Sequence, residues 1–567
     1  MALSRAAPII SHMTNSSGRG QFPAFHQPTL HPRRPVRWQR LAGACAAGLH
    51  LLAAGPAAAQ AAGADSATVS RFDIYQYVVE GNSTLSEPAI ETAVSGHMGE
   101  QKSLTDVEAA RAALEKAYHD AGFLTVVVSI PDQAVDTGEV LLKVVEATVD
   151  RLRVRGANYT LPSAVLAGVP ELAEGKVPNF NTMQAQLSAV NRGADTRVTP
   201  VLRAGRVPGT VEVQLDIDDQ LPLHGSVELN NRQTPNTTAA RLSASLRYDN
   251  LLQRGHSLGL TLQTAPQRPA DAQVVALNYM LPGMTAQEAW AMYFVHSRSA
   301  FDTLANAPGL GLLGNSDTFG LRYNLPVGAG SDATQRLSGG LDFKKIEQTI
   351  TVQHAGSFDA PIRYVPVVAN YSANLIDDAA TSVVDAGLTV GLRGLFGNSD
   401  ARFAAKRAGA SAQFLAMRLG LQHSRTLAGW TLSARMDSQL ATGPLVPTEQ
   451  MVAGGADSVR GYFEGERSGD LGLRISLEAR TPAFAIWGVA SPWRLTGLAL
   501  IDAARLRTLQ AQPLQLALHS LAGAGLGLRL TAPGGVSIEL DAVRALLRGD
   551  LTADGAYRVN ARAVWGF

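Results

Sequence analysis

The stretch Arg241-Leu-Ser-Ala-Ser-Leu-Arg-Tyr248 alternates between polar and apolar side chains at every residue. Alternate side chains of an extended chain lie on opposite faces. One face therefore carries four apolar or aromatic side chains: Leu242, Ala244, Leu246 and Tyr248. The pattern recurs at residues 256–263, 335–343 and 536–541. It fits a barrel wall between lipid and a polar interior, although a single segment would fit a soluble β-sandwich equally well.

The composition of the whole chain narrows this choice. The chain has 567 residues, of which 46% are hydrophobic and 17% charged, and its formal net charge is +1. Its mean hydropathy of +0.02 is high for a soluble protein, yet no internal segment has the ~20 apolar residues of a membrane helix. These values exclude a polytopic helical membrane protein. The balanced charge also gives no reason to expect nucleic acid as a partner.

We therefore expect a transmembrane antiparallel β-barrel over residues 220–567. At roughly 22 residues for each strand with its connection, this length gives about 16 strands. The chain ends in Val559-Asn-Ala-Arg-Ala-Val-Trp-Gly-Phe567, with Trp565 and Phe567 on the apolar face. This ending resembles the C-terminal assembly signal that outer-membrane proteins present to the barrel assembly machinery. An ordinary pair of interfacial aromatic residues is the alternative.

Residues 1–59 have the features of a secretory signal peptide. They contain six arginines and no acidic residue, followed by a short apolar stretch and the small residues Ala57-Ala58-Ala59. A membrane anchor helix is the alternative, although His50 and Pro56 interrupt the apolar stretch. Cleavage near Gln60 would leave residues 60–70 as a short linker. It would also remove the one cysteine of the chain, which argues against thiol chemistry or a cysteine metal site.

Two small α+β units are expected between the linker and the barrel, over residues 71–147 and 148–219. In the first, residues 72–79 form a strand, helices start at Ser86 and at a Thr105–Glu108 capping box, and two strands follow at 125–130 and 140–145. The second repeats this order in weaker form. We expect its strands at 149–154, 196–202 and 211–217, and its helix at 182–191.

The residues of these units resemble the POTRA domains of two-partner secretion transporters, the TpsB family. The resemblance rests on Gly81-Asn82, Tyr118, Gly122 and Pro131-Asp-Gln133 in the first unit, and on Pro208-Gly209-Thr210 in the second. It implies that the units lie in the periplasm. A small sheet with an open edge can add an extended segment of another chain through main-chain hydrogen bonds. A structural spacer is the alternative role.

The most specific motif begins at Leu445-Val-Pro and continues through Val459-Arg460-Gly461-Tyr462 to Gly472. It resembles the most characteristic stretch of TpsB transporters. The resemblance implies that a loop around residues 445–472 folds back into the barrel lumen, and that Arg460 pairs with Asp502 on the barrel wall. In the wall segment around Asp502, residues 498–504, Ala504 stands where the family has glycine. This puts a close backbone approach at that position in doubt. A solvated loop arginine is the alternative reading of Arg460.

The parity of the wall segment also favours a buried partner for Asp502. Leu498 and Leu500 share its face if the segment is a strand, so that face mixes apolar and charged residues. Strict alternation between lipid and lumen therefore fails here. A buried partner for Asp502 is the simplest explanation.

No catalytic motif accompanies these features. The chain has no phosphate-binding glycine loop, no nucleophile elbow and no metal-ligand spacing among its histidines. We therefore expect no enzyme activity, no cofactor and no metal.

The resemblance implies a monomeric outer-membrane protein of a Gram-negative bacterium. It would translocate a secreted partner protein of adhesin or haemolysin type, which carries an N-terminal secretion domain. Outer-membrane lipid and, during biogenesis, the barrel assembly machinery would be its other partners. An assembly factor that inserts other barrels and a passive porin are the alternatives.

Overall fold

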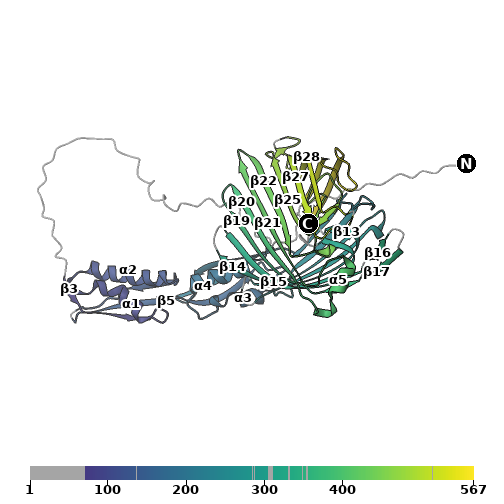
Figure 1. Ribbon diagram of the computed structural model, residues 1–567. Helices are drawn as coiled ribbons and strands as arrows, with labels where there is room; N and C mark the ends of the chain where they lie inside the picture. The colour runs from purple at the N-terminus through teal and green to yellow at the C-terminus, as the bar shows by residue number, and fades with distance from the viewer. Residues whose placement is uncertain are drawn as a thin grey trace. The chain divides into compact units, whose positions relative to one another are not determined.

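The computed structural model describes residues 71–135, 137–283, 285, 288–303, 311–329, 333–347, 349–352, 356–359, 361–488, 490–513 and 515–567. The expected signal peptide and linker lie outside these residues. The chain divides between Leu221 and Pro222 into two compact units (Figure 1). Within the described ranges, no helix is long and apolar enough to cross a bilayer.

The first α+β repeat is built around a three-stranded sheet of order β2-β5-β4, with β1 and β3 paired separately. Its elements are β1 (Phe72–Ile74), β2 (Gln76–Glu80), α1 (Glu87–Val94), the 3-10 turn η1 (Ser95–His97), β3 (Gly99–Lys102), α2 (Leu104–Asp120), β4 (Val126–Ser129) and β5 (Glu139–Glu146). The single strand expected at 72–79 is thus two strands that belong to different sheets. Strand β3 was not expected.

Helix α2 buries the apolar side chains that its periodicity predicts: Val107, Ala110, Leu114 and Tyr118. Its predicted start was wrong by two residues. Ser103 and Asp106 form the capping box, in place of Thr105 and Glu108. The Asp106 carboxylate accepts hydrogen bonds from the backbone N–H and the hydroxyl of Ser103, both at 2.8 Å. Both candidate boxes have the right residue types, so only the helix start decides between them.

The second repeat has the same sheet arrangement, with order β6-β8-β7. Its elements are β6 (Thr148–Arg155), α3 (Pro162–Gly168), η2 (Pro170–Leu172), α4 (Phe180–Val190), β7 (Thr196–Ala204) and β8 (Thr210–Asp219). The sequence prediction missed α3, which has a proline in its first turn. Each repeat encloses its own hydrophobic core, the first around Leu114 and Tyr118 and the second around Leu172 and Leu187.

Sixteen long antiparallel strands close into a barrel, which confirms the expected fold and strand number. They are β9 (Leu223–Asn230), β10 (Arg241–Leu251), β11 (His256–Thr264), β12 (Ala272–Pro282), β13 (Ala289–Thr303), β14 (Gly311–Ala329), β15 (Ala333–Glu347), β19 (Val367–Ile376), β20 (Ala380–Gly391), β21 (Phe414–Leu427), β22 (Trp430–Ala441), β25 (Leu471–Arg480), β27 (Arg494–Arg507), β28 (Leu518–Ala532), β29 (Val536–Ala545) and β30 (Tyr557–Gly566). The last strand pairs with the first. The short strands β18 (Ile362–Tyr364) and β26 (Phe484–Ala485) extend the ladders of β15 and β27.

The barrel wall has the two faces that alternation predicts. Along β11, Leu258 and Leu262 are exposed on the outside, whereas Thr261 and Gln263 are buried on the inside. Along β30, Trp565 is exposed and Asn560 is buried. Because the strands are antiparallel, successive connections lie at opposite rims. The first rim carries the N-terminal end of β9 and the C-terminal end of β30.

The longest described connections lie at the opposite rim, between β20 and β21 and between β22 and β25. The remaining elements belong to connections. They are the hairpin β16 (Thr349–Val352) and β17 (Gly356–Asp359), the helix α5 (Asp400–Lys406), the hairpin β23 (Met451–Ala453) and β24 (Arg467–Gly469), and the 3-10 turns η3 (Pro269–Asp271), η4 (Leu395–Gly397) and η5 (Pro447–Glu449).

Candidate functional site: the loop inside the barrel

The connection between β22 and β25, residues 442–470, is the segment in which the Val459-Arg460-Gly461-Tyr462 motif lies. All four motif residues are buried against the inner face of the wall. Gly461 has a φ of +99°, which favours glycine, and a Cβ there would lie 3.3 Å from the backbone nitrogen of Ala545. The loop backbone therefore lies directly on the wall at this point.

Arg460 binds Asp502 of β27 through three hydrogen bonds. Its Nε lies 2.7 Å from Oδ2, its Nη2 lies 2.8 Å from Oδ1, and its backbone N–H donates to Oδ2 at 3.0 Å. Asp502 is 0% exposed and Arg460 is 5% exposed. The structure thus brings together the two residues that the resemblance pairs, in the bidentate geometry that a guanidinium offers a carboxylate.

Two residues of β25 complete the arginine site, and the sequence prediction missed both. Arg460 Nη1 donates to Glu478 Oε1 at 2.7 Å, and Nη2 donates to Ser476 Oγ at 3.2 Å. Ser476 in turn donates to Asp502 Oδ1 at 2.6 Å. In register, Ser476 lies directly opposite Asp502. A sequence prediction of the β25–β27 register would have found this pair.

The inward face of β27 carries both apolar and charged side chains because the loop and neighbouring strands cover it. Leu498 and Leu500 point inward with Asp502, and they are buried with Val543 in a small cluster. Ala504 packs in a neighbouring cluster with Val459 and Tyr462 of the loop. The close backbone approach lies at Gly523 on β28, where a Cβ would overlap the carbonyl oxygen of Arg460.

Tyr462 ties the loop tip to two further segments. Its hydroxyl lies 2.8 Å from the carbonyl oxygen of Ala522 and 2.6 Å from that of Leu547. Ala522 belongs to β28, and Leu547 belongs to the connection after β29. The buried Tyr462 ring and its hydroxyl thus anchor the loop tip, residues 459–462, through contacts that do not involve the Arg460 side chain.

Three buried carboxylates hold the rest of the loop, and the sequence prediction assigned none of them a role. Glu449 accepts from Lys344 Nζ at 2.6 Å and from the Tyr364 hydroxyl at 2.7 Å. Asp470 pairs with Arg407 and accepts from the backbone N–H of Leu445 at 2.9 Å and of Leu509 at 2.7 Å. The third, Glu466, accepts from the backbone N–H of Thr552 at 2.9 Å.

These contacts fix the loop to distant parts of the wall. Lys344 lies on β15, the seventh strand of the ring, and Asp502 lies on β27, the thirteenth. The acidic residues were visible in the sequence as isolated charges in a glycine-rich loop. Their partners were not, because they lie up to 105 residues away along the chain.

The predicted POTRA residues hold turns and sheet ends in the first repeat. Gly81 has a φ of +87°, and a Cβ there would overlap the carbonyl oxygen of Val144. The Tyr118 hydroxyl donates to Asn82 Oδ1 at 2.5 Å. The Gln133 amide bonds both backbone groups of Leu141, at 2.6 and 2.8 Å, and so continues the ladder beyond the end of β4. The carbonyl of Pro131 accepts from the same amide at 3.3 Å.

Gly122 lies at the junction between the two repeats. Its carbonyl accepts from the backbone N–H of Phe180 at 2.8 Å. Asn179 caps helix α4 and also donates to the carbonyl of Ala121 at 2.9 Å. Gly122 has a φ of +100°, and a Cβ there would lie 2.7 Å from Asn179 Oδ1. Only glycine fits this junction without displacing Asn179.

In both repeats, a carboxylate at the end of the last strand accepts hydrogen bonds from backbone N–H groups in the turn after the first strand of the sheet. We call this arrangement a carboxylate clasp. Glu146 at the end of β5 accepts from the backbone N–H of Ser83 at 2.9 Å and of Thr84 at 3.0 Å. Asp219 at the end of β8 accepts from Tyr159 at 2.8 Å and Thr160 at 2.7 Å in the same way. Burial raises the pKa of each carboxyl, but these hydrogen bonds outweigh it, so the pKa of Glu146 and that of Asp219 lie below their ordinary values.

The two C-terminal aromatic residues lie on the outside of the barrel. Trp565 and Phe567 are exposed, with ring centroids 5.2 Å apart. The backbone of Phe567 exchanges two 2.9 Å hydrogen bonds with Gly225 of β9. A Cβ at Gly225 would overlap the Phe567 ring. The terminal residue thus completes the seam that closes the barrel.

Comparison with known proteins agrees with this architecture. The family model for the haemolysin secretion/activation protein ShlB/FhaC/HecB matches residues 209–530. The chain belongs to this family. The ShlB-type POTRA domain model matches residues 72–147. The family is one of outer-membrane transporters with periplasmic POTRA domains, so the rim that carries the N-terminal end of β9 faces the periplasm.

Two curated relatives resemble parts of the chain. The outer membrane transporter CdiB of Escherichia coli O6:K15:H31 (strain 536 / UPEC) is 25% identical over 181 residues, which are 32% of this chain and 30% of the relative. The heme/hemopexin transporter protein HuxB of Haemophilus influenzae (strain 86-028NP) is 21% identical over 404 residues, 68% of this chain and 67% of the relative. The match with CdiB therefore spans less than a third of that relative's length.

Solved structures share the fold. CdiB from Escherichia coli superposes with a TM-score of 0.59 at 20% identity, covering 89% of this chain and 92% of that one. BamA from Haemophilus ducreyi lacking POTRA domains 1–3 superposes with a TM-score of 0.52 at 15% identity, covering 88% of this chain and all of that one. At these identities the likeness concerns the fold alone.

Proposed function

We propose that the chain exports a partner exoprotein across the outer membrane by two-partner secretion. Its POTRA repeats, over residues 71–147 and 148–219, would capture the unfolded client, and the barrel over residues 220–567 would conduct it outward. The observation that carries the proposal is a closed barrel with a loop held inside it by the Arg460–Asp502 pair, in a chain of the haemolysin secretion/activation family. The client is a secreted protein of adhesin or haemolysin type with an N-terminal secretion domain.

Strand β4 is the edge at which we place client capture. In the sheet β2-β5-β4 it pairs with β5 on one side only. Val127 of β4, Leu124 just before it and Val145 opposite it on β5 are exposed apolar side chains. An extended client segment that pairs with β4 would satisfy its backbone groups and cover this apolar surface. Main-chain pairing tolerates many client sequences.

The loop anchor sets the state of the pore in this proposal. Arg460 and Asp502 hold the loop in a secretion-competent position, and Tyr462 keeps the tip on β28. The periplasm has no ATP, so folding of the client outside the cell would drive export. We assign no chemical step, no cofactor and no metal to the chain. It acts as a monomer in outer-membrane lipid, and the barrel assembly machinery recognises its Trp565 and Phe567 during biogenesis.

A barrel insertase is the second candidate, favoured by the shared fold with BamA. Coexpression with the partner exoprotein separates the candidates. The wild-type chain is expected to secrete the partner, and deletion of residues 72–218 is expected to abolish secretion while the barrel remains folded. Permeation of small solutes that is unchanged by this deletion, without secretion of the partner, would indicate a passive porin. Copurification with unfolded barrel precursors, without secretion, would indicate the insertase.

A further inference from the structure

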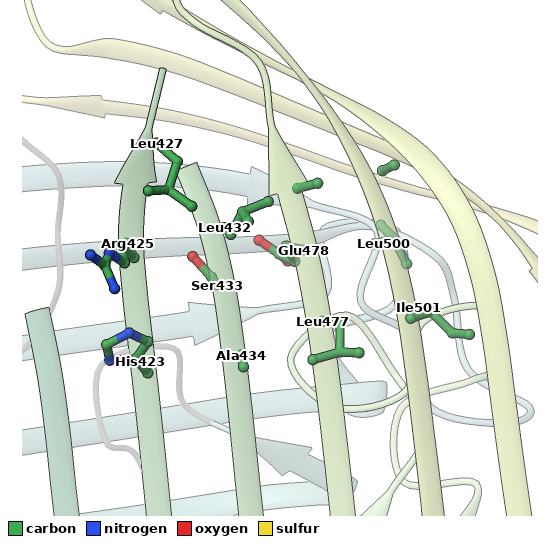
Figure 2. A pocket seen from close by; sticks show the side chains of 12 residues that line it. His423, Arg425, Leu427, Leu432, Ser433, Ala434, Leu477, Glu478, Leu500 and Ile501 are labelled. Atoms are coloured by element: carbon green, nitrogen blue, oxygen red, sulfur yellow. The ribbon is translucent and has the colours of Figure 1, made fainter. Parts of the chain in front are cut away.

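A groove of about 560 Å³ crosses strands β21, β22, β25 and β27 of the wall (Figure 2). Most of its lining side chains belong to the lipid-facing set of their strands, as the exposed Leu427, Leu432, Leu477 and Ile501 show. Its floor contains a run of small residues: Ala434, Ala479 and Ala499. The volume lies within the ~300–1,000 Å³ of ordinary ligand sites. Because the groove opens to lipid, its natural occupant is an apolar chain.

Two nitrogen-bearing side chains line one side of the groove. His423 and Arg425 lie on the same face of β21, on the opposite side from Leu477 and Ile501 (Figure 2). His423 Nδ1 lies 2.9 Å from Ser382 Oγ. Within the described part of the chain, Arg425 meets no carboxylate and makes no side-chain hydrogen bond. No group of the described chain neutralises this guanidinium, so an anion from outside the protein is its expected partner.

The position of Arg425 indicates which leaflet supplies that anion. Strand β21 is the tenth of the ring, so it runs toward the periplasmic rim and ends there in the turn at residues 428–429. Trp430 lies opposite Leu427, and Leu432 lies opposite Arg425. The exposed Trp430 marks the membrane interface on this side. Arg425 is two residues, or about 7 Å along the strand, closer to the membrane centre. Its long side chain can therefore reach back to the headgroup level.

We propose that this groove binds one glycerophospholipid of the periplasmic leaflet. Arg425 holds the phosphate in bidentate geometry, His423 donates a further hydrogen bond, and one acyl chain lies over the alanine run. Arginine suits this role because its planar fork matches a phosphate and stays charged. The groove lies behind the loop anchor, since Glu478 bonds Arg460 inside the barrel while Leu477 and Ala479 line the groove outside. The proposal depends on the membrane location of the barrel and not on client export.

Native mass spectrometry of the full-length protein, titrated with phosphatidylglycerol in detergent, tests this site. The wild-type protein is expected to retain one lipid. Arg425→Gln should weaken binding about tenfold or more, as for the loss of a charge-assisted hydrogen bond. Ala479→Phe should weaken it similarly by filling the groove. Ala386→Phe is the matched control, because Ala386 faces lipid on β20 outside the groove, and it should bind as wild type.

Three results would overturn the proposal. Lipid binding by Arg425→Gln that is as tight as that of wild type would show that Arg425 does not hold the phosphate. Weakened binding in Arg425→Gln with wild-type binding in Ala479→Phe would indicate surface charge attraction without an acyl chain in the groove. Tighter binding of lipid A than of phosphatidylglycerol at this site would show that the site lies in the outer leaflet and not in the periplasmic one. A heat-dependent gel shift shows for each variant that the barrel is folded, and partner secretion plays no part in the readout.

Discussion

Arg460 and Asp502 lie 42 residues apart in the sequence and share three hydrogen bonds in the structure, one of them from the Arg460 backbone. The backbone contact fixes the position of the loop as well as the side chain. Both residues are buried, so removing one partner strands the other charge, at a cost of about 3–5 kcal/mol. The pair therefore positions the loop tip on β27.

Asp470 is predicted to hold together the two ends of the same loop, where it leaves the barrel wall and returns to it. Its carboxylate is 0% exposed and joins Arg407, Leu445 and Leu509 from three separate segments. Asp470→Asn should destabilise this region by about 3–5 kcal/mol and lower the temperature at which the barrel unfolds in a heat-shift gel. Glu347→Gln is the matched control, because Glu347 pairs with Lys345 at 2.6 Å and both side chains are exposed, at 55% and 39%. It should change stability by less than about 1 kcal/mol. Equal shifts in the two variants would contradict the assigned role.

Gly122 is predicted to be required at the junction of the POTRA repeats. Gly122→Ala in a fragment of residues 71–219 should lower the free energy of unfolding, because it adds a steric clash with Asn179 to the strain of a positive φ. Gly175→Ala isolates the second effect. Gly175 has a φ of +86°, and a Cβ added there would meet nothing within 4 Å, so it should cost only about 1–2 kcal/mol. Urea unfolding followed by near-UV circular dichroism compares the two. A loss no greater for Gly122→Ala than for Gly175→Ala would show that the junction tolerates a side chain.

The carboxylate clasps are predicted to make POTRA stability depend on pH. The folded-state pKa of Glu146 and that of Asp219 are lowered, so their contribution is fully present above the unfolded-state values of about 4.5 and 3.8. It is lost as the pH falls through the still lower folded-state values. Glu146→Gln should therefore unfold more easily than wild type at pH 7, by about 1–2 kcal/mol. The difference should shrink below about pH 4. Urea midpoints of the 71–219 fragment at pH 7 and pH 3.5 measure this, and a difference that stays constant between the two would refute the clasp.

The fold was predictable because its main signals are local. Alternation along segments such as 241–248 gave the barrel wall, and the chain length gave the strand number. Helix α3 and the start of α2 were not, because Pro162 and the two overlapping capping boxes are compatible with more than one local structure. At the site, the family motif led to Arg460 and Asp502. Glu478 and Asp470 required the strand register and the loop path, which depend on contacts between residues far apart in the sequence.

Secretion of the coexpressed partner protein by an Arg460→Ala variant tests the role of the Arg460–Asp502 pair most directly. We expect a folded, heat-modifiable barrel in the outer membrane and a fall in secreted partner of at least about tenfold, since the buried Asp502 loses its counter-charge. Arg435→Ala is the control, because Arg435 also pairs with an aspartate, at 2.9 Å, but is 47% exposed, and it should secrete normally. Wild-type secretion by Arg460→Ala, with the barrel folded, would contradict the claim that this pair holds the loop in its working position.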